Sequence, residues 1–231
     1  MLPRVLEPET LDHLAPDDPV AQRSRRDLRR VNAWMGNGSI IARALRDSAN
    51  GAVPGQILEL GAGDGQLLLR VAQTLAPLWP NVEVTLLDRQ PLVEAMTFAE
   101  YTALGWKAEA RVVDVSDWIA ERGRPVDIVI ANLFLHHFPV EQLTELFGAL
   151  AERARLFVAL DPRRGAWPLF CSRLLGIIRC NAVTRHDARV SVHAGFAATE
   201  LSSVWPQSGE WVLNERSAGL FSHLFVARRK N

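Results

Sequence analysis

The chain has 231 residues, 48% of them apolar, and its 26 basic residues balance 26 acidic ones. This length fits one α/β domain with extensions, and a formal charge of zero excludes a global field that would recruit nucleic acid or a membrane. The 2 cysteines are too few for a disulfide framework, no apolar run could span a bilayer, and the acidic N-terminus is unlike a signal peptide, so a cytoplasmic protein is expected.

The first third of the chain predicts an irregular lead-in and two helices. Prolines and acids dominate residues 1–19, and apolar spacings of three and four predict a helix over residues 20–35. Ser39 could cap a second helix, which ends at Asn50-Gly51. The first helix carries an arginine cluster, for which a solvated or salt-bridged face is expected and a phosphate, carrier-protein or anionic-lipid contact is the alternative. Its members are Arg23, Arg25, Arg26, Arg29 and Arg30.

From residue 55 onward, strand and helix patterns alternate. Strands are predicted at 56–60, 82–87, 108–113, 126–131 and 156–160, with helices at 66–76, 91–104, 116–122 and 140–153. This alternation predicts a parallel sheet covered by helices on both faces. A helix at 168–179, a polar loop through His186-Asp187 and a helix capped by Ser191 follow. Strands at 211–216 and 221–228, joined by a short turn, form an antiparallel pair.

The most informative stretch is Ile57-Leu58-Glu59-Leu60-Gly61-Ala62-Gly63-Asp64-Gly65. A carboxylate interrupts an apolar strand there, and a glycine-rich turn leads into a helix; Asp88 and Asp114 end the next two strands. Together these residues resemble the class I S-adenosylmethionine-dependent methyltransferases, from about Gly55 to the C-terminus. The resemblance implies an α/β three-layer sandwich with a seven-stranded, mostly parallel sheet, an antiparallel C-terminal hairpin whose last strand inserts between the fifth and sixth, and N-terminal helices.

The same resemblance assigns roles around S-adenosylmethionine. Glu59 reaches toward the methionine portion, or else fixes loop amides as a structural carboxylate. Asp88 accepts both ribose hydroxyls, with a helix cap as the alternative. Asp114 accepts from the adenine amine, with Asp117 as its competitor, and Val115 packs on the ring. The implied cofactor-binding set is Glu59, Gly61, Ala62, Gly63, Asp88, Arg89, Asp114, Val115 and Asn132.

The fourth strand ends in Asn132-Leu133-Phe134-Leu135-His136-His137-Phe138. This departs from the Asn/Asp-Pro-Pro-aromatic tetrapeptide of nucleic-acid amino methyltransferases, and Leu-His-His-Phe resembles many small-molecule methyltransferases. His136 or His137 could act as a general base toward a hydroxyl, or could fix the loop by hydrogen-bonding backbone. Because Leu133 is apolar and no acid is near in sequence, no metal is expected.

Two parts of the chain are expected to have separate roles. Residues 1–54 form a helical extension that acts as a substrate lid, and residues 55–231 form the cofactor-binding domain, with an insertion at about 162–190. An apolar substrate pocket could be lined by Trp34, Met35, Trp167, Phe170 and Leu174, although ordinary packing is the alternative for each.

The expected function is methyl transfer to a small organic acceptor, an aromatic or phenolic hydroxyl. The alternatives are an N-, C- or lipid-head-group methyltransferase, a non-catalytic cofactor-binding scaffold and a nicotinamide oxidoreductase. Nucleic-acid binding and integral membrane association are not expected. A homodimer or a carrier-protein contact through the arginine cluster is left open.

Overall fold

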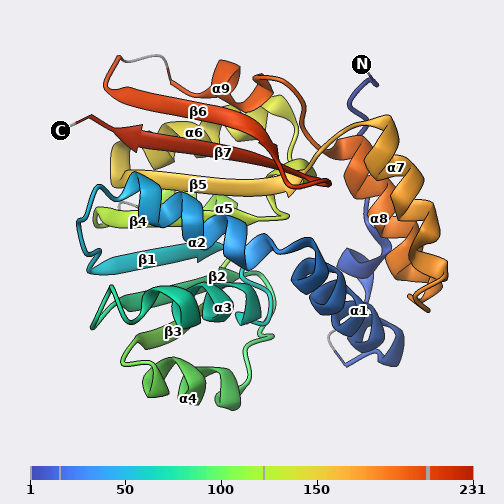
Figure 1. Ribbon diagram of the computed structural model, residues 1–231, viewed down its shortest axis with the longest axis horizontal. Coiled ribbons are helices and arrows are strands. Elements are labelled where there is room, and N and C mark those ends of the chain that lie inside the picture. The colour runs from blue at the N-terminus through green and yellow to red at the C-terminus, as the bar shows by residue number, and fades with distance from the viewer. Residues whose placement is uncertain (1, 16, 122, 207–208, 231) are drawn as a thin grey trace.

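The computed structural model describes residues 2–15, 17–121, 123–206 and 209–230, and a seven-stranded sheet forms its centre (Figure 1). The strand order is β3-β2-β1-β4-β5-β7-β6, and β7 alone runs antiparallel to its neighbours. This confirms the insertion of the last strand between the fifth and sixth. In chain order the strands are β1 (Gln56–Leu60), β2 (Glu83–Asp88), β3 (Lys107–Val112), β4 (Val126–Asn132), β5 (Ala154–Pro162), β6 (Trp211–Ala218) and β7 (Ser222–Arg229).

Helices cover both faces of the sheet. In chain order they are η1 (Thr10–His13), α1 (Pro19–Met35), α2 (Asn37–Ser48), α3 (Gln66–Leu75), α4 (Ala95–Ala103), α5 (Val115–Ala120), η2 (Leu135–His137), α6 (Val140–Arg153), α7 (Ala166–Arg173), η3 (Leu174–Gly176), α8 (Ala182–Ala194) and α9 (Glu200–Val204). Because successive strand residues point to opposite faces, Ile57 of β1 packs into one apolar layer and Leu58 into the other.

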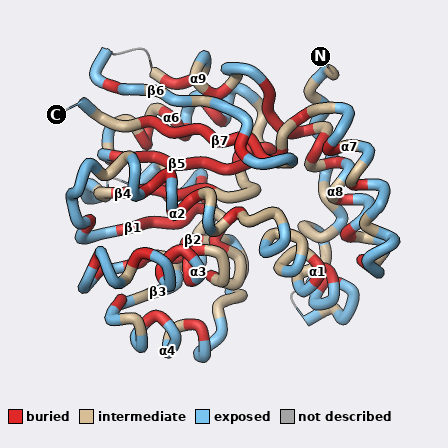
Figure 2. The backbone as a smooth tube through the Cα atoms, in the orientation of Figure 1, coloured by how far each residue is buried: buried red, intermediate tan, exposed pale blue. Residues whose placement is uncertain are grey.

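The two apolar layers make the predicted three-layer sandwich (Figure 2). One layer joins the sheet to α2, α3 and α4, and includes Leu45, Leu68 and Tyr101. The other layer joins it to α5, α6 and α9 through side chains that include Phe147 and Trp205. Helix α2, which lies in the stretch expected to act as a lid, therefore packs into the core of the molecule.

Several predicted helix boundaries are wrong. The helix predicted at 168–179 is α7, which begins at Ala166 and ends at Arg173, and the 3-10 helix η3 follows it. Helix α4 starts at Ala95 rather than residue 91, because Asp88 Oδ1 accepts a hydrogen bond from Gln90 N at 2.9 Å and holds the chain in a turn. Helix α2 starts at Asn37 after a left-handed Gly36, so Ser39 lies inside its first turn and does not cap it. Helix α5 ends at Ala120, and its predicted last residue, Arg122, lies outside the described residues.

The largest difference concerns α8, where a polar loop and a Ser191 cap were predicted. Residues 182–194 form one continuous helix, capped by the Asn181 side chain, which accepts from Thr184 N at 2.8 Å. Asp187 is buried in this helix because its carboxylate accepts hydrogen bonds from the backbone of Thr10 and Leu11, each at 2.9 Å. A buried partner far away in the chain thus turns a loop-like sequence into helix.

The N-terminal strap, defined as residues 2–13, lies against α8 and the loop that follows β4. Val5 N donates to His193 O at 3.1 Å, and the Arg4 guanidinium donates to Ala194 O at 2.8 Å and to Phe138 O at 2.9 Å. The strap, α1, α7 and α8 gather at one end of the sheet (Figure 1). Among the described residues, no helix has both the length and the apolar character needed to cross a bilayer.

Candidate functional site

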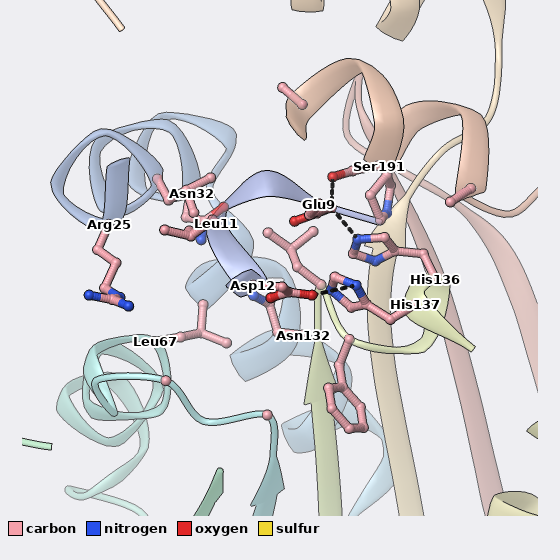
Figure 3. A pocket seen from close by; sticks show the side chains of 18 of the residues that line it. Glu9, Leu11, Asp12, Arg25, Asn32, Leu67, Asn132, His136, His137 and Ser191 are labelled. Carbon is pink, nitrogen blue, oxygen red and sulfur yellow. Dashed lines mark hydrogen bonds and ion pairs between the residues drawn. The ribbon is translucent and has the colours of Figure 1, made fainter. Parts of the chain in front are cut away.

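A cavity of about 850 Å³ lies at the carboxyl ends of β1, β2 and β4. The sheet order reverses at β1, with β2 and β3 on one side and β4 and β5 on the other, and open α/β sheets bind ligands at such a point. The strap, α1, α7 and α8 contribute the opposite wall (Figure 3). All nine residues expected to bind the cofactor, and both candidate histidines, line this one cavity.

The glycine-rich turn after β1 approaches the cavity closely. Gly61 has a φ of 65°, and a methyl group added to it would lie 2.3 Å from the Phe134 ring. Gly63 has a φ of 56°, and its N–H donates to Asp88 Oδ2 at 2.8 Å. Glycine is suited to both positions because positive φ strains other residues. Glycine therefore allows the conformation of this turn, and the hydrogen bond from Gly63 to Asp88 connects the turn to the end of β2.

Glu59 is the residue whose environment most clearly requires a ligand. Its carboxylate is buried, and Oε2 has no hydrogen-bond partner among the described residues. Burial, followed by the charges of Asp64 and Asp88, raises the pKa of the Glu59 carboxyl well above its usual range. A cationic group placed beside Oε2 would relieve this cost. The ammonium of S-adenosylmethionine is such a group, so the site fits this cofactor.

Asp88 and Asp114 both line the cavity, and both also accept hydrogen bonds from backbone N–H groups. Asp88 uses one oxygen for Gly63 N and the other for Gln90 N, and α4 begins too late for Asp88 to cap it. Asp114 caps α5, because its Oδ1 accepts from the Ser116 N–H at 2.9 Å and from the Ser116 hydroxyl at 2.7 Å. Those bonds hold the pKa of the Asp114 carboxyl below its usual range.

Each of these carboxylates keeps acceptor capacity for a ligand, since a carboxylate has about four lone-pair positions. Asp114 Oδ2 accepts no hydrogen bond from the described residues. Asp117, its predicted competitor, lies in the first turn of α5, away from the cavity-lining set. Arg89 donates to Asp12 O at 3.3 Å and pairs with the Asp12 carboxylate at 3.2 Å, so it also fastens the strap.

The end of β4 is held in an unusual conformation. Leu133 has a φ of 51°, which is strained for a residue with a branched side chain, and its N–H donates to Leu160 O at 2.8 Å. Asn132 accepts at Oδ1 from the Asn37 amide at 3.2 Å, which links this turn to the buried start of α2. The turn directs Phe134 against Gly61 and brings η2, with both histidines, to the cavity.

His136 lies between two carboxylates. Its Nδ1 is 2.8 Å from Asp161 Oδ1, and its Nε2 is 3.2 Å from Glu9 Oε1, which also accepts from the Ser191 hydroxyl (Figure 3). Burial lowers the pKa of the imidazole, but hydrogen bonds and charges from Asp161 and Glu9 outweigh it and raise the pKa to about 9. His136 is thus an imidazolium at neutral pH, with both ring N–H groups donating to the carboxylates.

His137 has the opposite character. Its ring centroid is 4.2 Å from that of His136, and its Nδ1 is 3.6 Å from Asp12 Oδ2, beyond hydrogen-bond distance. Burial, followed by the positive charge of His136, lowers the pKa of the His137 imidazole. His137 therefore remains neutral at pH 7 and keeps a lone pair that can accept a proton. Of the two histidines, only His137 is in the protonation state of a base.

The expectation that no acid lies near the histidines is wrong. The strap brings Glu9 and Asp12 to them, and the end of β5 brings Asp161. Glu9, His136 and His137 offer ligand atoms that all lie within 4.8 Å of one another, so this group could hold a metal ion. In the structure the same atoms of Glu9 and His136 bind one another.

Sequence patterns did not identify Glu9, because 127 residues separate it from His136 and nothing near it in sequence marks it. The sequence did indicate Asp161, because it follows the fifth strand near the expected cleft, where it could orient a substrate or supply the base; in the structure it binds His136 Nδ1 at 2.8 Å. His186 and His193 do not belong to the lining set.

The apolar pocket residues are only partly as expected. Trp34 and Met35 line the cavity, whereas Trp167, Phe170 and Leu174 point away from it and are exposed. The other face of α7 lines the cavity instead, through Pro168, Cys171, Ser172 and Leu175 of α7 and η3.

The arginine cluster of α1 is partly salt-bridged, as expected. Arg29 pairs with Asp64 of the glycine-rich turn at 2.7 Å, and Arg30 pairs with Asp27 at 3.3 Å. Arg25 donates to Gln90 Oε1 at 3.2 Å. These contacts fix α1 over the cofactor side of the cavity.

Comparisons of the sequence and of the fold with known proteins both find methyltransferases. Residues 57–155 match the family of the methyltransferase domain. The plantazolicin methyltransferase BpumL in complex with SAH has a TM-score of 0.64 and 14% identity, over 93% of this chain and 92% of that chain. Among curated proteins, none matches the chain.

Two further solved structures are similar. An O-methyltransferase family protein from Burkholderia thailandensis has a TM-score of 0.61 and 17% identity, over 94% of this chain and 62% of that chain. Magnesium protoporphyrin IX methyltransferase (ChlM) from Synechocystis PCC 6803, with bound SAH, has a TM-score of 0.54 and 15% identity, over 95% of this chain and 91% of that chain. At these identities the structural likeness concerns the fold. Residues 57–155 therefore match a methyltransferase domain, and the fold of the chain is the one that these solved methyltransferases share.

Proposed function

We propose that this enzyme transfers the methyl group of S-adenosylmethionine to a hydroxyl oxygen of a small aromatic or phenolic acceptor. The observation that carries the proposal is the position of His137, which lines the same cavity as the glycine-rich turn and Asp88. Burial and the charge of His136 lower the pKa of its imidazole, as a base requires. A base beside the donor suits an acceptor that must lose a proton during transfer. An amine acceptor that is already neutral has a free lone pair and needs no such base.

The cofactor supplies an electrophilic methyl group, and the chain positions both reactants. Glu59 would bind the methionine ammonium, Asp88 the ribose hydroxyls, and Asp114 the adenine amine, with Val115 against the ring. Asn132 lines the cavity beside this set and is fixed by its hydrogen bond with Asn37. Holding two reactants in line can supply much of the rate enhancement of a displacement reaction.

The two histidines have different roles in the proposed reaction. His137 accepts the hydroxyl proton as the acceptor oxygen attacks. His136 cannot act as a base while Glu9 and Asp161 hold it as an imidazolium. Burial, followed by the charge of His136, keeps His137 unprotonated, so His136 positions the loop and His137 is the free base.

The structural neighbours do not identify the acceptor of this enzyme or the atom that is methylated. One is named for plantazolicin and another for magnesium protoporphyrin IX, whereas a third is described only as an O-methyltransferase family protein. The alternatives of nitrogen, carbon or lipid-head-group methylation therefore remain distinct outcomes of an acceptor screen.

The test is a screen of phenols and catechols with an assay coupled to the demethylated cofactor, followed by histidine variants on the best acceptor. His137→Ala should lower turnover by about 10²–10⁴, the usual contribution of a general base, and leave cofactor affinity unchanged. The loss should shrink as the pH approaches about 10, where a phenol ionises without help. His186→Ala is the matched control, because His186 lies in α8 outside the cavity.

Three results would contradict the proposal in different ways. Turnover of amines but not of phenols would make nitrogen the acceptor. An unchanged rate for His137→Ala at every pH would remove its role as base. Loss of activity on chelation, restored by a divalent ion, would make Glu9, His136 and His137 a metal centre instead.

A further inference from the structure

Helix α7 and the following turn η3 have two faces with different surroundings. The inner face lines the cavity, and the outer face carries an apolar stripe that is exposed: Trp167, Phe170, Leu174, Ile177 and Ile178. The exposed fraction is 53% for Trp167 and 77% for Ile177. Trp167 and Phe170 are three residues apart on α7 and therefore lie on one side of that helix, and the exposed Leu174, Ile177 and Ile178 follow directly in η3 and the turn after it. Contiguous exposed apolar surface of this kind marks an interaction site.

The polar residues beside the stripe are basic. Between Asp161 and Asp187 the chain contains no acidic residue, and it contains five arginines. Three exposed arginines, with His186, line an open hollow between α7 and α8; they are Arg173, Arg185 and Arg189. We call this the arginine hollow. No carboxylate belongs to its lining among the described residues, although the buried Asp187 contacts His186 Nδ1 at 3.1 Å.

The arginine hollow and the apolar stripe are adjacent. Arg173 directly precedes Leu174 in the stripe. A methyl group added to Gly176, which lies inside the stripe segment, would be 3.2 Å from Arg185 Nη1. None of the three arginines forms an ion pair with a described residue. Helices α7 and α8 lie together at one end of the molecule (Figure 1). The apolar stripe and the arginine hollow therefore lie side by side at that end.

We propose that the apolar stripe and the arginine hollow together dock on an anionic lipid surface. The stripe enters the boundary between headgroups and acyl chains, and the three arginines bind lipid phosphates. This combination of an aromatic and aliphatic face with a basic flank is the chemistry of an interfacial helix. Phosphate oxygens match guanidinium donors, and apolar side chains need no hydrogen-bond partner in the acyl region. Because the formal charge of the chain is zero, the attraction comes from this surface alone.

The test is flotation of the full chain with two kinds of vesicle. One kind is phosphatidylcholine alone, and in the other about one third of the lipid is phosphatidylglycerol, which supplies an anionic surface. The wild-type chain should bind the anionic vesicles, and high salt should weaken the binding. The assay needs no methyl transfer, so it tests this surface independently of the proposed acceptor.

Matched variants separate the two components. Arg173→Gln combined with Arg189→Gln should lower partitioning by about 25-fold, because each arginine near an anionic surface contributes about fivefold. Ile177→Asp combined with Phe170→Asp should lower it by at least about tenfold, since two inserted apolar side chains are lost. The controls are Arg43→Gln on α2 and Met96→Asp on α4, where Met96 is 67% exposed. Neither control should change binding, and all variants should still bind S-adenosylmethionine.

Two outcomes would overturn the proposal. One is equal binding of wild type, stripe and arginine variants to the anionic vesicles. The other is absence of vesicle binding together with a dimer that Ile177→Asp and Phe170→Asp convert to monomer, in which case a second copy of the chain covers the stripe.

Discussion

Removal of the Glu9 carboxylate should release the N-terminal strap. Glu9 Oε1 binds the His136 imidazolium at 3.2 Å and accepts from Ser191, and its side chain is only 12% exposed. A hydrogen bond to a charged group contributes about 1.5–3 kcal/mol, so Glu9→Ala should raise the population of open strap by about 10- to 150-fold. Glu9→Gln keeps a neutral acceptor and should have about a tenfold effect.

The same contact predicts how strap closure depends on pH. The pKa of His136 is raised from 6.5 to about 9, so its stabilisation is complete below pH 6.5 and is lost as the pH rises through 9. The pKa of Glu9 is lowered from 4.5 to about 2, so its stabilisation is complete above pH 4.5 and is lost as the pH falls through 2. Strap closure should therefore be firmest between pH 4.5 and 6.5.

Hydrogen exchange of residues 2–13, followed by mass spectrometry, measures strap opening directly. In wild type, protection corrected for intrinsic exchange should fall between pH 6.5 and 9. In Glu9→Gln it should be lower throughout and change less with pH. Glu7→Gln is the control, because it removes the same charge from an exposed neighbour in the strap. If Glu9→Gln and Glu7→Gln exchange alike, the buried contact does not hold the strap, and the reasoning fails.

Two further predictions concern the cofactor and the fold. Asp88→Ala should weaken S-adenosylmethionine binding by at least about 10- to 150-fold in calorimetry, the loss expected for even one of its two hydrogen bonds to the ribose hydroxyls. Glu83→Gln, at the other end of β2, is its control, and affinity within threefold of wild type would leave Asp88 only its backbone contacts. Glu215→Ala should lower the free energy of unfolding by about 3–5 kcal/mol, because it leaves buried donors unpaired. Glu215 accepts from Leu201 N, Ser202 N and His223 Nε2, and denaturant titration, with Glu210→Ala as the exposed control, measures the loss.

Local patterns in the sequence were enough to locate the sheet. Strand β1 and helix α6 have the predicted ends, because an apolar run and a helical period are properties of the segment itself. Ligands of open α/β sheets bind at the carboxyl ends of the strands, and this rule predicted from the sequence alone that Asp88 and Asn132 line one cavity. These predictions agree with the structure because each depends on residues that are close in sequence.

Features that depend on distant partners were missed. Asp187 is buried inside a helix, where it accepts hydrogen bonds from two backbone N–H groups of the strap. The protonation of His136 depends on Glu9, whose position is set by the fold of the N-terminus against α8. Trp167, Phe170 and Leu174 of α7 and η3 could have lined the pocket or packed in the core, and in the structure they do neither; the sequence does not show that the opposite face of α7 covers the cavity.

The interior position of β7 has a consequence for the order in which the sheet can form. Strand β7 follows the other six strands along the chain, yet it pairs with β5 on one side and with β6 on the other. While β7 is unpaired, the edge of β5 is open, and apolar side chains on β5, including Phe157, lack a neighbour that buries them in the folded molecule. Such an edge is a template for aggregation, and any change that unpairs β7 removes the centre of an antiparallel ladder.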